Sequence, residues 1–257
     1  MIKRKIAVDP ERFPTEVRGV FAGANVYDSS SGDKARVYYC DTGFYVKAAV
    51  KGELKKEAEL GRFFHSRGLG VEVLAYFSGE EDYLVTRSAA GEDLTHFTQA
   101  PEKLCEILAK ALRLLHGQPV DGVPVSAAIN SYRDWVDGDL CGRNCSDWVR
   151  LDRFPVGTKE DAWAIVQANK HRLKADTLIH GDACLPNVIV NHGKFETFLD
   201  FDMAGAGDRH MDLYWAIWSL RYNLKTEKYT DLFLDLYGRE NFDPEMITVV
   251  AAFELLG

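Results

Sequence analysis

Short apolar and aromatic runs alternate with turn-forming residues over the first third of the chain. Their β-branched and aromatic residues favour strands rather than helices. The runs are residues 17–21, 35–40, 44–50, 71–77 and 82–86. Asp28-Ser-Ser-Ser-Gly-Asp33 and Gly79-Glu80-Glu81 separate neighbouring runs and are typical of turns. The pattern therefore predicts a front part built from short strands.

Apolar residues recur at helical spacing in the remaining segments. These are residues 53–66, 101–116, 158–171, 208–220 and 243–256. Thr158-Lys-Glu-Asp161 resembles a capping box, and Pro101 and Pro244 suit the first position of a helix. One of these helices follows the front strands, and the others follow residue 91. The pattern predicts an α+β protein with a boundary near residue 90, a common place for a ligand cleft.

Composition narrows the class of protein. The chain has 257 residues, 46% of them hydrophobic and 27% charged, which is an ordinary globular composition. Its 31 basic and 39 acidic side chains give a charge of −8, which argues against a nucleic acid or an anionic membrane as partner. No apolar run reaches the length of a membrane span, and the N-terminus lacks the pattern of a signal peptide. We therefore expect a cytoplasmic protein.

The five cysteines agree with a reducing compartment, because an odd number at irregular spacing is a poor disulfide framework. Cys141-Gly-Arg-Asn-Cys145 could suggest a zinc knuckle. No second Cys or His pair follows at ligand spacing, so we expect reduced thiols rather than a structural zinc site.

The stretch around His180-Gly-Asp182 carries the clearest chemical signal. Asn187 follows that Asp after four residues, and Asp200 comes after two short predicted strands that turn at His192-Gly193. Protein kinases use H-R-D-x4-N followed by a metal-binding Asp, and here the loop is H-G-D-x4-N. An Asp that accepts a proton, with an Asn and a second Asp as ligands for Mg²⁺, suits phosphoryl transfer to a hydroxyl.

The front part offers complementary residues. Lys47 lies in an apolar strand and Glu57 lies one turn into the next helix, the arrangement by which protein kinases aim an ammonium at the α- and β-phosphates. A strand lysine alone usually faces solvent, but the downstream loop favours the functional interpretation. The turn that contains Ser30 and Ser31 has no glycine-rich phosphate motif. It is either a phosphate flap or a plain hairpin turn.

Taken together, these motifs make the sequence similar to the aminoglycoside phosphotransferase family, and within it to the 3'-phosphotransferase (kanamycin kinase) branch. The resemblance covers nearly the whole chain. Its matching pieces are residues 35–38, 45–47, Glu57, 86–91, 180–187, 198–200, 207–212, 231–238 and 253–256.

The resemblance implies a fold and an activity. The fold would be bilobal and protein-kinase-like, with a small antiparallel β lobe with one helix at residues 1–90 and a larger, mainly helical lobe at residues 91–257. The activity would be ATP-dependent transfer of the γ-phosphate to an aminoglycoside hydroxyl, the 3'-hydroxyl, which confers antibiotic resistance. The protein would be a monomer or a weak homodimer that acts on a small cationic molecule.

The resemblance also implies roles for individual residues. Asp182 would be the catalytic base, and His180 would brace its loop. The other site residues would bind the nucleotide, the metal or the substrate, while Asp208 and Asp212 would be helix caps or structural partners. The residues that would bind ATP are Lys47 held by Glu57, Tyr45 stacked on adenine, Ser88 and Ala89 at the adenine edge, and Ser30 and Ser31 in the flap over the phosphates. Asn187 and Asp200 would hold Mg²⁺. Asp152 and Glu254 would bind the substrate.

Two departures from the family leave alternatives open. Asp202-Met203 stands where many relatives have Gly-Arg, and Tyr222 and Asn223 stand where relatives place acidic residues. A kinase for another small hydroxyl substrate, such as a macrolide, a choline-like amine or a sugar, is one alternative. A nucleotide-sensing protein that has lost transfer is the other. Residues 94–257 hold 17 basic and 24 acidic side chains, which favours a cationic substrate on that part of the chain.

Overall fold

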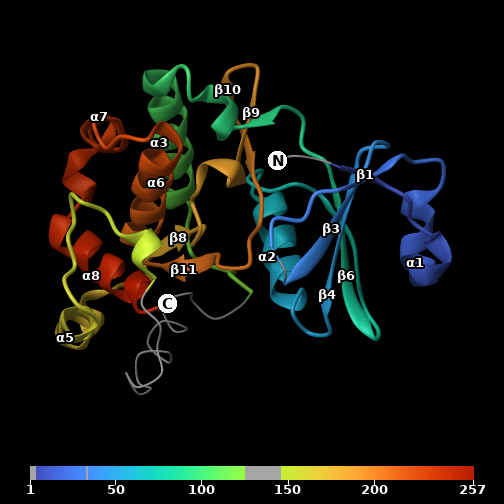
Figure 1. Cartoon of the computed structure of the whole chain (residues 1–257), viewed down its shortest axis with the longest axis horizontal. Helices are drawn as coiled ribbons and strands as arrows, with labels where there is room; N and C mark the ends of the chain where they lie inside the picture. Colours follow the sequence, from blue (N-terminus) through green and yellow to red (C-terminus); the bar gives the residue numbers. More distant parts are fainter. Residues whose placement is uncertain (1–3, 33, 125–145) are drawn as a thin grey trace. The chain divides into compact units, whose positions relative to one another are not determined.

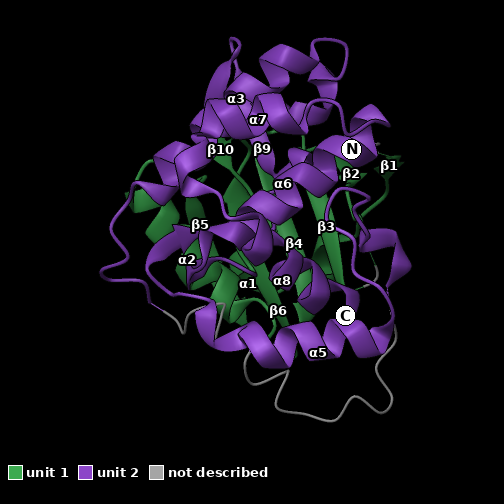
Figure 2. Ribbon diagram, turned by 90° about the vertical axis from the view of Figure 1, so that its left-hand side faces the viewer, with its two compact units in different colours: residues 1–90, 196–202 green, residues 91–195, 203–257 purple. Residues whose placement is uncertain are grey.

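The computed structural model describes residues 4–32, 34–124 and 146–257. The chain forms two compact units (Figure 2). The first contains Met1–Ala90 and Glu196–Asp202, and the second contains Gly91–Phe195 and Met203–Gly257. The short return to the first unit at Glu196–Asp202 places Asp200 in the same unit as Lys47. Cys141 and Cys145, the zinc knuckle considered above, lie outside the described residues.

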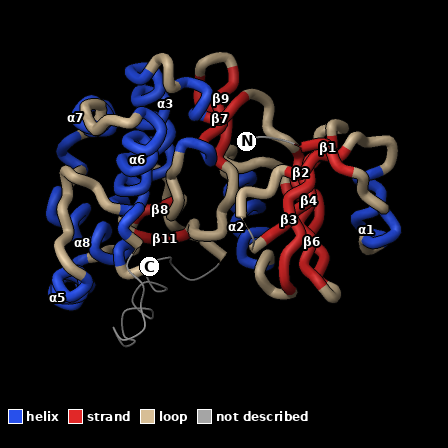
Figure 3. Tube along the Cα trace, in the orientation of Figure 1, coloured by secondary structure: helices blue, strands red, loops and turns tan. Residues whose placement is uncertain are grey.

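A six-stranded antiparallel sheet forms the first unit, with the strand order β1-β2-β3-β4-β6-β5 (Figures 1 and 3). Its strands are β1 (Arg4–Ile6), β2 (Val26–Asp28), β3 (Ala35–Cys40), β4 (Phe44–Val50), β5 (Val73–Ser78) and β6 (Glu81–Arg87). The last four agree with predicted strands, because each has alternating apolar residues bounded by turn residues. Paired strands in this sheet are consecutive in sequence, except that β4 pairs with β6.

The predicted strand at residues 17–21 was wrong. These residues form the end of helix α1 (Thr15–Arg18) and a 3₁₀ turn, η2 (Gly19–Phe21). Pro14 precedes the helix as its N-cap residue and Glu16 lies in its first turn, where a negative charge is favourable. Val17 and Phe21 are buried against one face of the sheet with Val46 and Val85, so tertiary packing outweighs the β propensity of these residues.

Helix α2 (Lys55–Ser66) packs near the opposite face of the sheet. Ala58 of this helix shares a small core with Ala49 of β4 and Leu84 of β6. Side chains alternate between the two faces of a strand, so Tyr45, Lys47 and Ala49 lie on the face that α2 covers. The helix therefore brings Glu57 to the side of the sheet that carries Lys47.

Helices dominate the second unit. Those described are α3 (Pro101–His116), α5 (Lys159–Asn169), α6 (Arg209–Leu224), α7 (Thr230–Tyr237) and α8 (Pro244–Leu255). The capping box at the start of α5 is confirmed, because the Asp161 amide donates to the Thr158 hydroxyl and the Thr158 amide donates to the Asp161 carboxylate. With the strand-rich first unit, this arrangement confirms the predicted α+β class.

Short strand pairs hold the chemically informative loop of the second unit. β8 (Thr177–Ile179) pairs antiparallel with β11 (Gly205–Gly207) and leads directly into the loop that begins at His180. β9 (Val188–Asn191) pairs with β7 (Glu92–Asp93). His192 and Gly193 have φ values of 48° and 71°, as a tight two-residue hairpin turn requires. The chain then returns to the first unit along β10 (Lys194–Phe198).

None of the helices in the described part of the chain is long and apolar enough to cross a membrane. Cys40, Cys105 and Cys184 are free thiols. Burial raises the pKa of Cys40 and Cys105 to about 11, so both are protonated and inert at neutral pH.

Candidate active site

Lys47 of the first unit lies between two carboxylates. Its Nζ is 2.8 Å from Glu57 Oε2 and 3.2 Å from Asp200 Oδ1. The predicted contact between Lys47 and Glu57 is therefore present. The contact with Asp200 was not predicted, because it joins residues 153 positions apart.

The return segment holds Asp200 in place through its neighbours. Phe198 donates its backbone N–H to the Leu69 carbonyl at 2.9 Å, and the Phe201 ring packs on Phe64 of α2 with centroids 4.4 Å apart. Asp200 itself has a φ of 64°, a left-handed conformation that Asp tolerates better than most residues. A backbone conformation of this kind persists only where the surrounding structure enforces it, and such conformations are common at functional sites.

One ammonium faces an excess of negative charge in this cluster. Burial raises the pKa of Glu57 to about 7; Lys47 opposes this shift, whereas Asp200 and Asp202 add to it. Burial disfavours the charged form of Lys47, but Glu57 and Asp200 outweigh that effect and raise its pKa. The site thus keeps the ammonium of Lys47 charged.

Replacing Glu57 by Gln is expected to change how stability depends on pH. The folded-state pKa of Glu57 lies above its ordinary value of 4.5, so the native state retains this proton to higher pH than the unfolded state does. The contribution of Glu57 to the free energy of unfolding should therefore fall by up to about 3 kcal/mol between about pH 4.5 and pH 7.

Urea unfolding at several pH values, with EDTA present, measures this effect. The difference in unfolding free energy between the wild type and Glu57→Gln should shrink or reverse as the pH rises across that window. The exposed Glu53→Gln serves as the control and should show a constant difference. A pH-independent difference for Glu57→Gln would contradict the raised pKa.

Tyr45 lies two residues before Lys47 on the same face of β4. Its ring is 4.9 Å from the ring of Tyr39 on the neighbouring strand. The segment after β6, with Ser88 and Ala89, runs beside the start of β4, and the Ser88 amide donates to the Gly43 carbonyl at 2.9 Å. That amide is therefore used within the protein.

The turn with Ser30 and Ser31 is closed by its own hydrogen bonds. The Val37 amide donates to the Ser30 hydroxyl at 2.9 Å, and the Ser30 amide donates to Asp28 at 3.0 Å. Ser31 is exposed. Ser30 therefore has a structural function in the hairpin, which favours the plain-turn alternative for this residue.

Asp82 of β6 is a buried carboxylate that sequence reasoning missed. It is fully buried and accepts hydrogen bonds from the amides of Gly52 and Leu54 and from the hydroxyls of Tyr76 and Ser78. Burial disfavours its charge, but these donors outweigh that effect and lower its pKa. Asp82 thus fixes the turn that leads into α2, three residues before Glu57. Its position could have indicated this burial, because Asp82 lies two residues before Leu84 and therefore on the same apolar face of the strand.

Replacing Asp82 by Ala should leave four donors without their acceptor inside the protein. We expect the free energy of unfolding to fall by about 3 kcal/mol, because unsatisfied buried donors are costly. Urea unfolding at pH 7 measures this change, with Glu80→Ala in the neighbouring turn as the control. A loss below about 1 kcal/mol for Asp82→Ala would show that the hydrogen bonds of Asp82 do not stabilise the turn that leads into α2.

In the second unit, Asp182 is fixed by residues of its own loop. The Asn187 Nδ2 donates to Asp182 Oδ2 at 2.9 Å and to the Asp182 carbonyl at 3.0 Å. The Asp182 amide donates to Nδ1 of the fully buried His180, at 3.3 Å. His180 therefore braces the loop by hydrogen bonding, as predicted. The Asn187 amide oxygen is the atom that remains for a cation.

Asp212 anchors the same loop from helix α6. Its Oδ2 and Oδ1 accept the backbone amides of His180 and Gly181 at 2.8 and 2.7 Å, and His116 Nε2 lies 3.0 Å from Oδ2. Gly181 has a φ of 82°, and a Cβ there would come within 2.1 Å of the Met203 carbonyl oxygen. This close approach explains why the loop reads H-G-D rather than the H-R-D of protein kinases.

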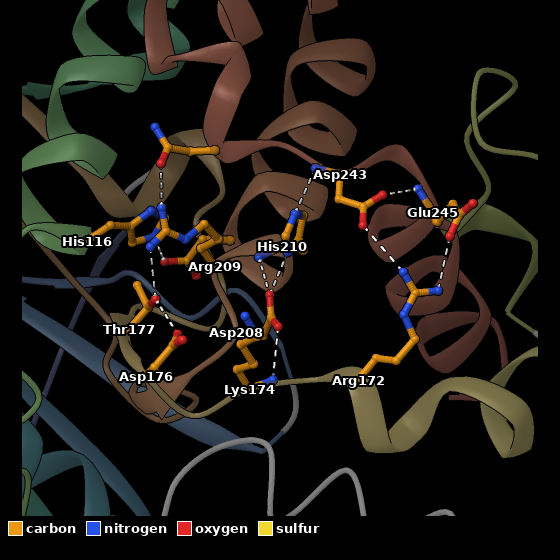
Figure 4. Close-up of polar contacts among 12 residues, drawn as sticks. His116, Arg172, Lys174, Asp176, Thr177, Asp208, Arg209, His210, Asp243 and Glu245 are labelled. Atoms are coloured by element: carbon orange, nitrogen blue, oxygen red, sulfur yellow. Dashed lines mark hydrogen bonds and ion pairs between the residues drawn. The ribbon is translucent and has the colours of Figure 1, made fainter.

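Asp208 is the N-cap of α6, as predicted, and it ties this helix to α8 (Figure 4). His210 Nδ1 donates to Asp208 Oδ1 at 2.6 Å, and His210 Nε2 accepts the Asp243 amide at 3.0 Å. Asp243 caps α8 in turn. These contacts are structural and fix the starts of the two helices that carry Trp215 and Glu254.

The two predicted substrate carboxylates lie in the second unit. Glu254 of α8 is half-buried, and its Oε1 accepts from Trp215 Nε1 at 3.1 Å. Asp152 is exposed, and its amide donates to Glu227 Oε1 at 3.1 Å. Tyr222 is exposed, whereas the Asn223 amide donates to Ser219 of its own helix. Thus an aromatic ring, rather than a carboxylate, faces solvent at the end of α6.

These two sets of residues define a class of protein. An ammonium braced by a helix carboxylate and a loop aspartate held by an asparagine are the parts of a kinase-like phosphotransferase. The sequence pattern of the phosphotransferase enzyme family matches residues 30–247, and the chain belongs to this family.

Individual relatives point to one branch of the family. The chain is 35% identical over 259 residues to the "Probable aminoglycoside 3'-phosphotransferase" of Lactococcus lactis, covering 99% of this chain and 98% of the relative. It is 31% identical over 172 residues to the aminoglycoside 3'-phosphotransferase of Niallia circulans, covering 66% and 65% of the two chains. The predicted aminoglycoside phosphotransferase membership is confirmed.

Solved structures confirm the fold. An aminoglycoside phosphotransferase from Streptomyces rimosus, solved also with ADP and streptomycin, aligns with a TM-score of 0.71 at 19% identity over 98% of this chain and all of that one. An aminoglycoside-3'-phosphotransferase of type VIII aligns with a TM-score of 0.71 at 21% identity, over 96% of both chains.

Proposed function

We propose that this enzyme transfers the γ-phosphate of ATP to a hydroxyl of an aminoglycoside, the 3'-hydroxyl, in the cytoplasm. The observation that carries the proposal is the Asp182 carboxylate held by the Asn187 amide in the H-G-D-x4-N loop. The full-length similarity to an aminoglycoside 3'-phosphotransferase supports the choice of acceptor. Under this proposal the activity confers resistance to the drug.

Asp182 would act on the acceptor hydroxyl. It would orient the hydroxyl oxygen toward the γ-phosphorus and accept the proton as the new oxygen–phosphorus bond forms and the bond to the β-phosphate oxygen breaks. Asn187 holds one carboxylate oxygen, so the carboxylate cannot rotate freely. Positioning of this kind supplies most of the catalysis in phosphoryl transfer.

Residues of the first unit would bind the nucleotide. Lys47, fixed by Glu57, would contact the α- and β-phosphates, and Tyr45 would stack on the adenine ring. The backbone of Ser88 and Ala89 would bind the adenine edge, and Ser31 would lie over the phosphates. The common face of Tyr45 and Lys47 on β4 supports this assignment, because the base and the phosphates of one nucleotide could then contact the same side of the sheet.

The residues present fit a magnesium ion. Asp200 and the Asn187 amide oxygen are hard oxygen ligands, the donor type that Mg²⁺ prefers. Mg²⁺ usually keeps several waters and is held by one or two carboxylates together with substrate phosphates, which matches a site with few protein ligands. Bound there, Mg²⁺ would neutralise charge on the phosphates.

Glu254 and Asp152 would bind ammonium groups of the acceptor. The excess of acidic side chains over residues 94–257 supports a cationic substrate. Carboxylates pair strongly with ammonium groups where water is partly excluded, as at half-buried Glu254.

An ADP-release assay with ATP and Mg²⁺ tests the proposal. Kanamycin and neomycin should be turned over, and ³¹P and proton NMR of the product should place the phosphate on the 3'-hydroxyl. A macrolide, choline and glucose complete the panel. Turnover of one of these with none of any aminoglycoside would refute the proposed acceptor.

A further inference from the structure

Four aromatic side chains gather at one place in the second unit. Trp215, Trp218 and Tyr222 lie along α6, and Trp148 lies on a 3₁₀ turn, η4 (Asp147–Val149). Trp218 and Tyr222 stack with centroids 5.0 Å apart and planes 15° apart. The Trp148 ring lies 5.2 Å from that of Trp218 and 6.1 Å from that of Trp215. We call these four residues the aromatic cluster.

The cluster is fixed although two of its rings face solvent. Trp148 is 61% exposed and Tyr222 is 54% exposed. Trp218 Nε1 donates to the Trp148 carbonyl at 3.0 Å, and the Tyr214 hydroxyl donates to the Val149 carbonyl, so α6 anchors the turn on both sides. Large exposed rings that are already immobilised lose little entropy on binding, which is typical of recognition surfaces.

The cluster adjoins the loop of Asp182. Cys184 of that loop donates its thiol to the Trp215 carbonyl at 3.9 Å, and the Leu185 amide donates to the Ser219 hydroxyl at 3.0 Å. Trp215 also donates to Glu254, the predicted substrate carboxylate. From Trp215 to Tyr222 the helix extends by about 10 Å. The aromatic stripe thus leads away from the catalytic loop over the length of a small saccharide.

An ammonium group already lies on the outer ring. Lys225 Nζ is 4.2 Å from the centroid of Tyr222, within the range of a cation–π interaction. The face of Tyr222 that does not stack on Trp218 therefore accepts a primary ammonium, the group that an amino sugar carries. Lys225 is exposed and can leave this position.

We propose that the aromatic cluster is an acceptor subsite that binds an amino-sugar ring, with Trp148 and Tyr222 against its faces and ammonium groups. This inference rests on the proposed aminoglycoside acceptor and names the surface that recognises it. The rings of Trp148 and Tyr222 would thereby supply part of the recognition of the acceptor at the exposed end of α6. Glu254, hydrogen-bonded to Trp215, adds a carboxylate at the edge of the same surface.

The first test separates binding of acceptor from binding of ATP. Trp148→Ala and Tyr222→Ala should each raise KM for kanamycin about tenfold, because each removes one aromatic contact made equally in the ground and transition states. KM for ATP and kcat should stay within about twofold. Trp148→Phe and Tyr222→Phe should stay within about threefold of wild type, and a thermal scan should show all four folded.

Lys225 allows a matched pair of variants. Lys225→Met should lower KM for kanamycin, because it frees the Tyr222 ring from the protein's own ammonium. Lys228→Met removes the same charge from the equivalent position over Tyr229, 4.7 Å from its centroid, outside the aromatic cluster. The fall in KM should be at least threefold larger for Lys225→Met. Equal changes would assign the effect to net charge and count against the subsite.

Intrinsic fluorescence gives a readout that does not depend on turnover, since three of the five tryptophans lie in the aromatic cluster. Kanamycin should change the emission of the wild type saturably, and Trp148→Ala should weaken the apparent affinity about tenfold. Phosphorylation of kanamycin with unchanged KM in both alanine variants would overturn the subsite and leave the proposed function intact. Neither fluorescence change nor turnover with any aminoglycoside would overturn both.

Discussion

Replacing Asp182 by Ala is expected to lower kcat with kanamycin by about 10² to 10⁴-fold, the range that a positioned general base contributes. The loop should survive the change, because Asn187 Nδ2 also donates to the Asp182 carbonyl, which the substitution leaves in place. Binding of ATP should persist, since Lys47, Glu57 and Tyr45 belong to the other compact unit. Single-turnover kinetics and ATP binding by calorimetry measure the two effects separately.

Asp182→Asn is the matched control for geometry. The amide retains an oxygen that can accept from Asn187 but is a far weaker base, so kcat should fall nearly as far as in Asp182→Ala. A reduced kcat with an unchanged thermal midpoint identifies a chemical function rather than a structural one. An Asp182→Ala enzyme with wild-type turnover would refute the assigned mechanism.

The sequence predicted Lys47 and Glu57 as a pair because local rules place both. Alternation along β4 puts Lys47 on the face opposite Val46, and Glu57 falls in the first turn of the next helix. The H-G-D-x4-N spacing likewise encloses a loop whose own residues hold Asp182. Such contacts depend on a few neighbouring residues, so the sequence pattern could specify them.

Other features depend on residues far apart in the chain. Asp200 joins Lys47 through the return segment of the first unit, and Asp82 meets donors from a turn some thirty residues earlier. The segment from Val17 to Phe21 is helical because its apolar side chains pack on the sheet. No local pattern encodes these pairings, because tertiary packing decides them.

The aromatic cluster depends on contacts between residues far apart in the chain. From the sequence alone, Tyr222 is a single aromatic residue near the end of a predicted helix. In the structure it stacks on Trp218, which in turn contacts Trp148 some seventy residues earlier in the chain. Recognition of a cation by π faces and by carboxylates can coexist on one surface, since each acts on a different face of the ligand.

Asp212→Asn is expected to impair both folding and turnover, although it changes one oxygen to an NH₂ group. In the described part of the chain, the partners of this fully buried carboxylate are all placed to donate: the amides of His180 and Gly181 and the ring of His116. The new NH₂ group could donate to Nε2 of His116 if the His116 ring changed to the tautomer protonated at Nδ1. The backbone amide of His180 would then point at this NH₂ group, which cannot accept its hydrogen bond. We expect a loss of about 2–4 kcal/mol in unfolding free energy.

The same substitution should lower kcat by about 10- to 100-fold, because displacement of the loop backbone by about 1 Å moves Asp182 relative to the acceptor. Asp231→Asn is the control. That exposed carboxylate pairs with Arg153 and Arg239, and its loss should cost less than about 1 kcal/mol and leave kcat unchanged. Urea unfolding and kcat at a temperature where both variants are folded test this. An Asp212→Asn enzyme with normal stability and kcat would show that the catalytic loop holds its conformation without the carboxylate.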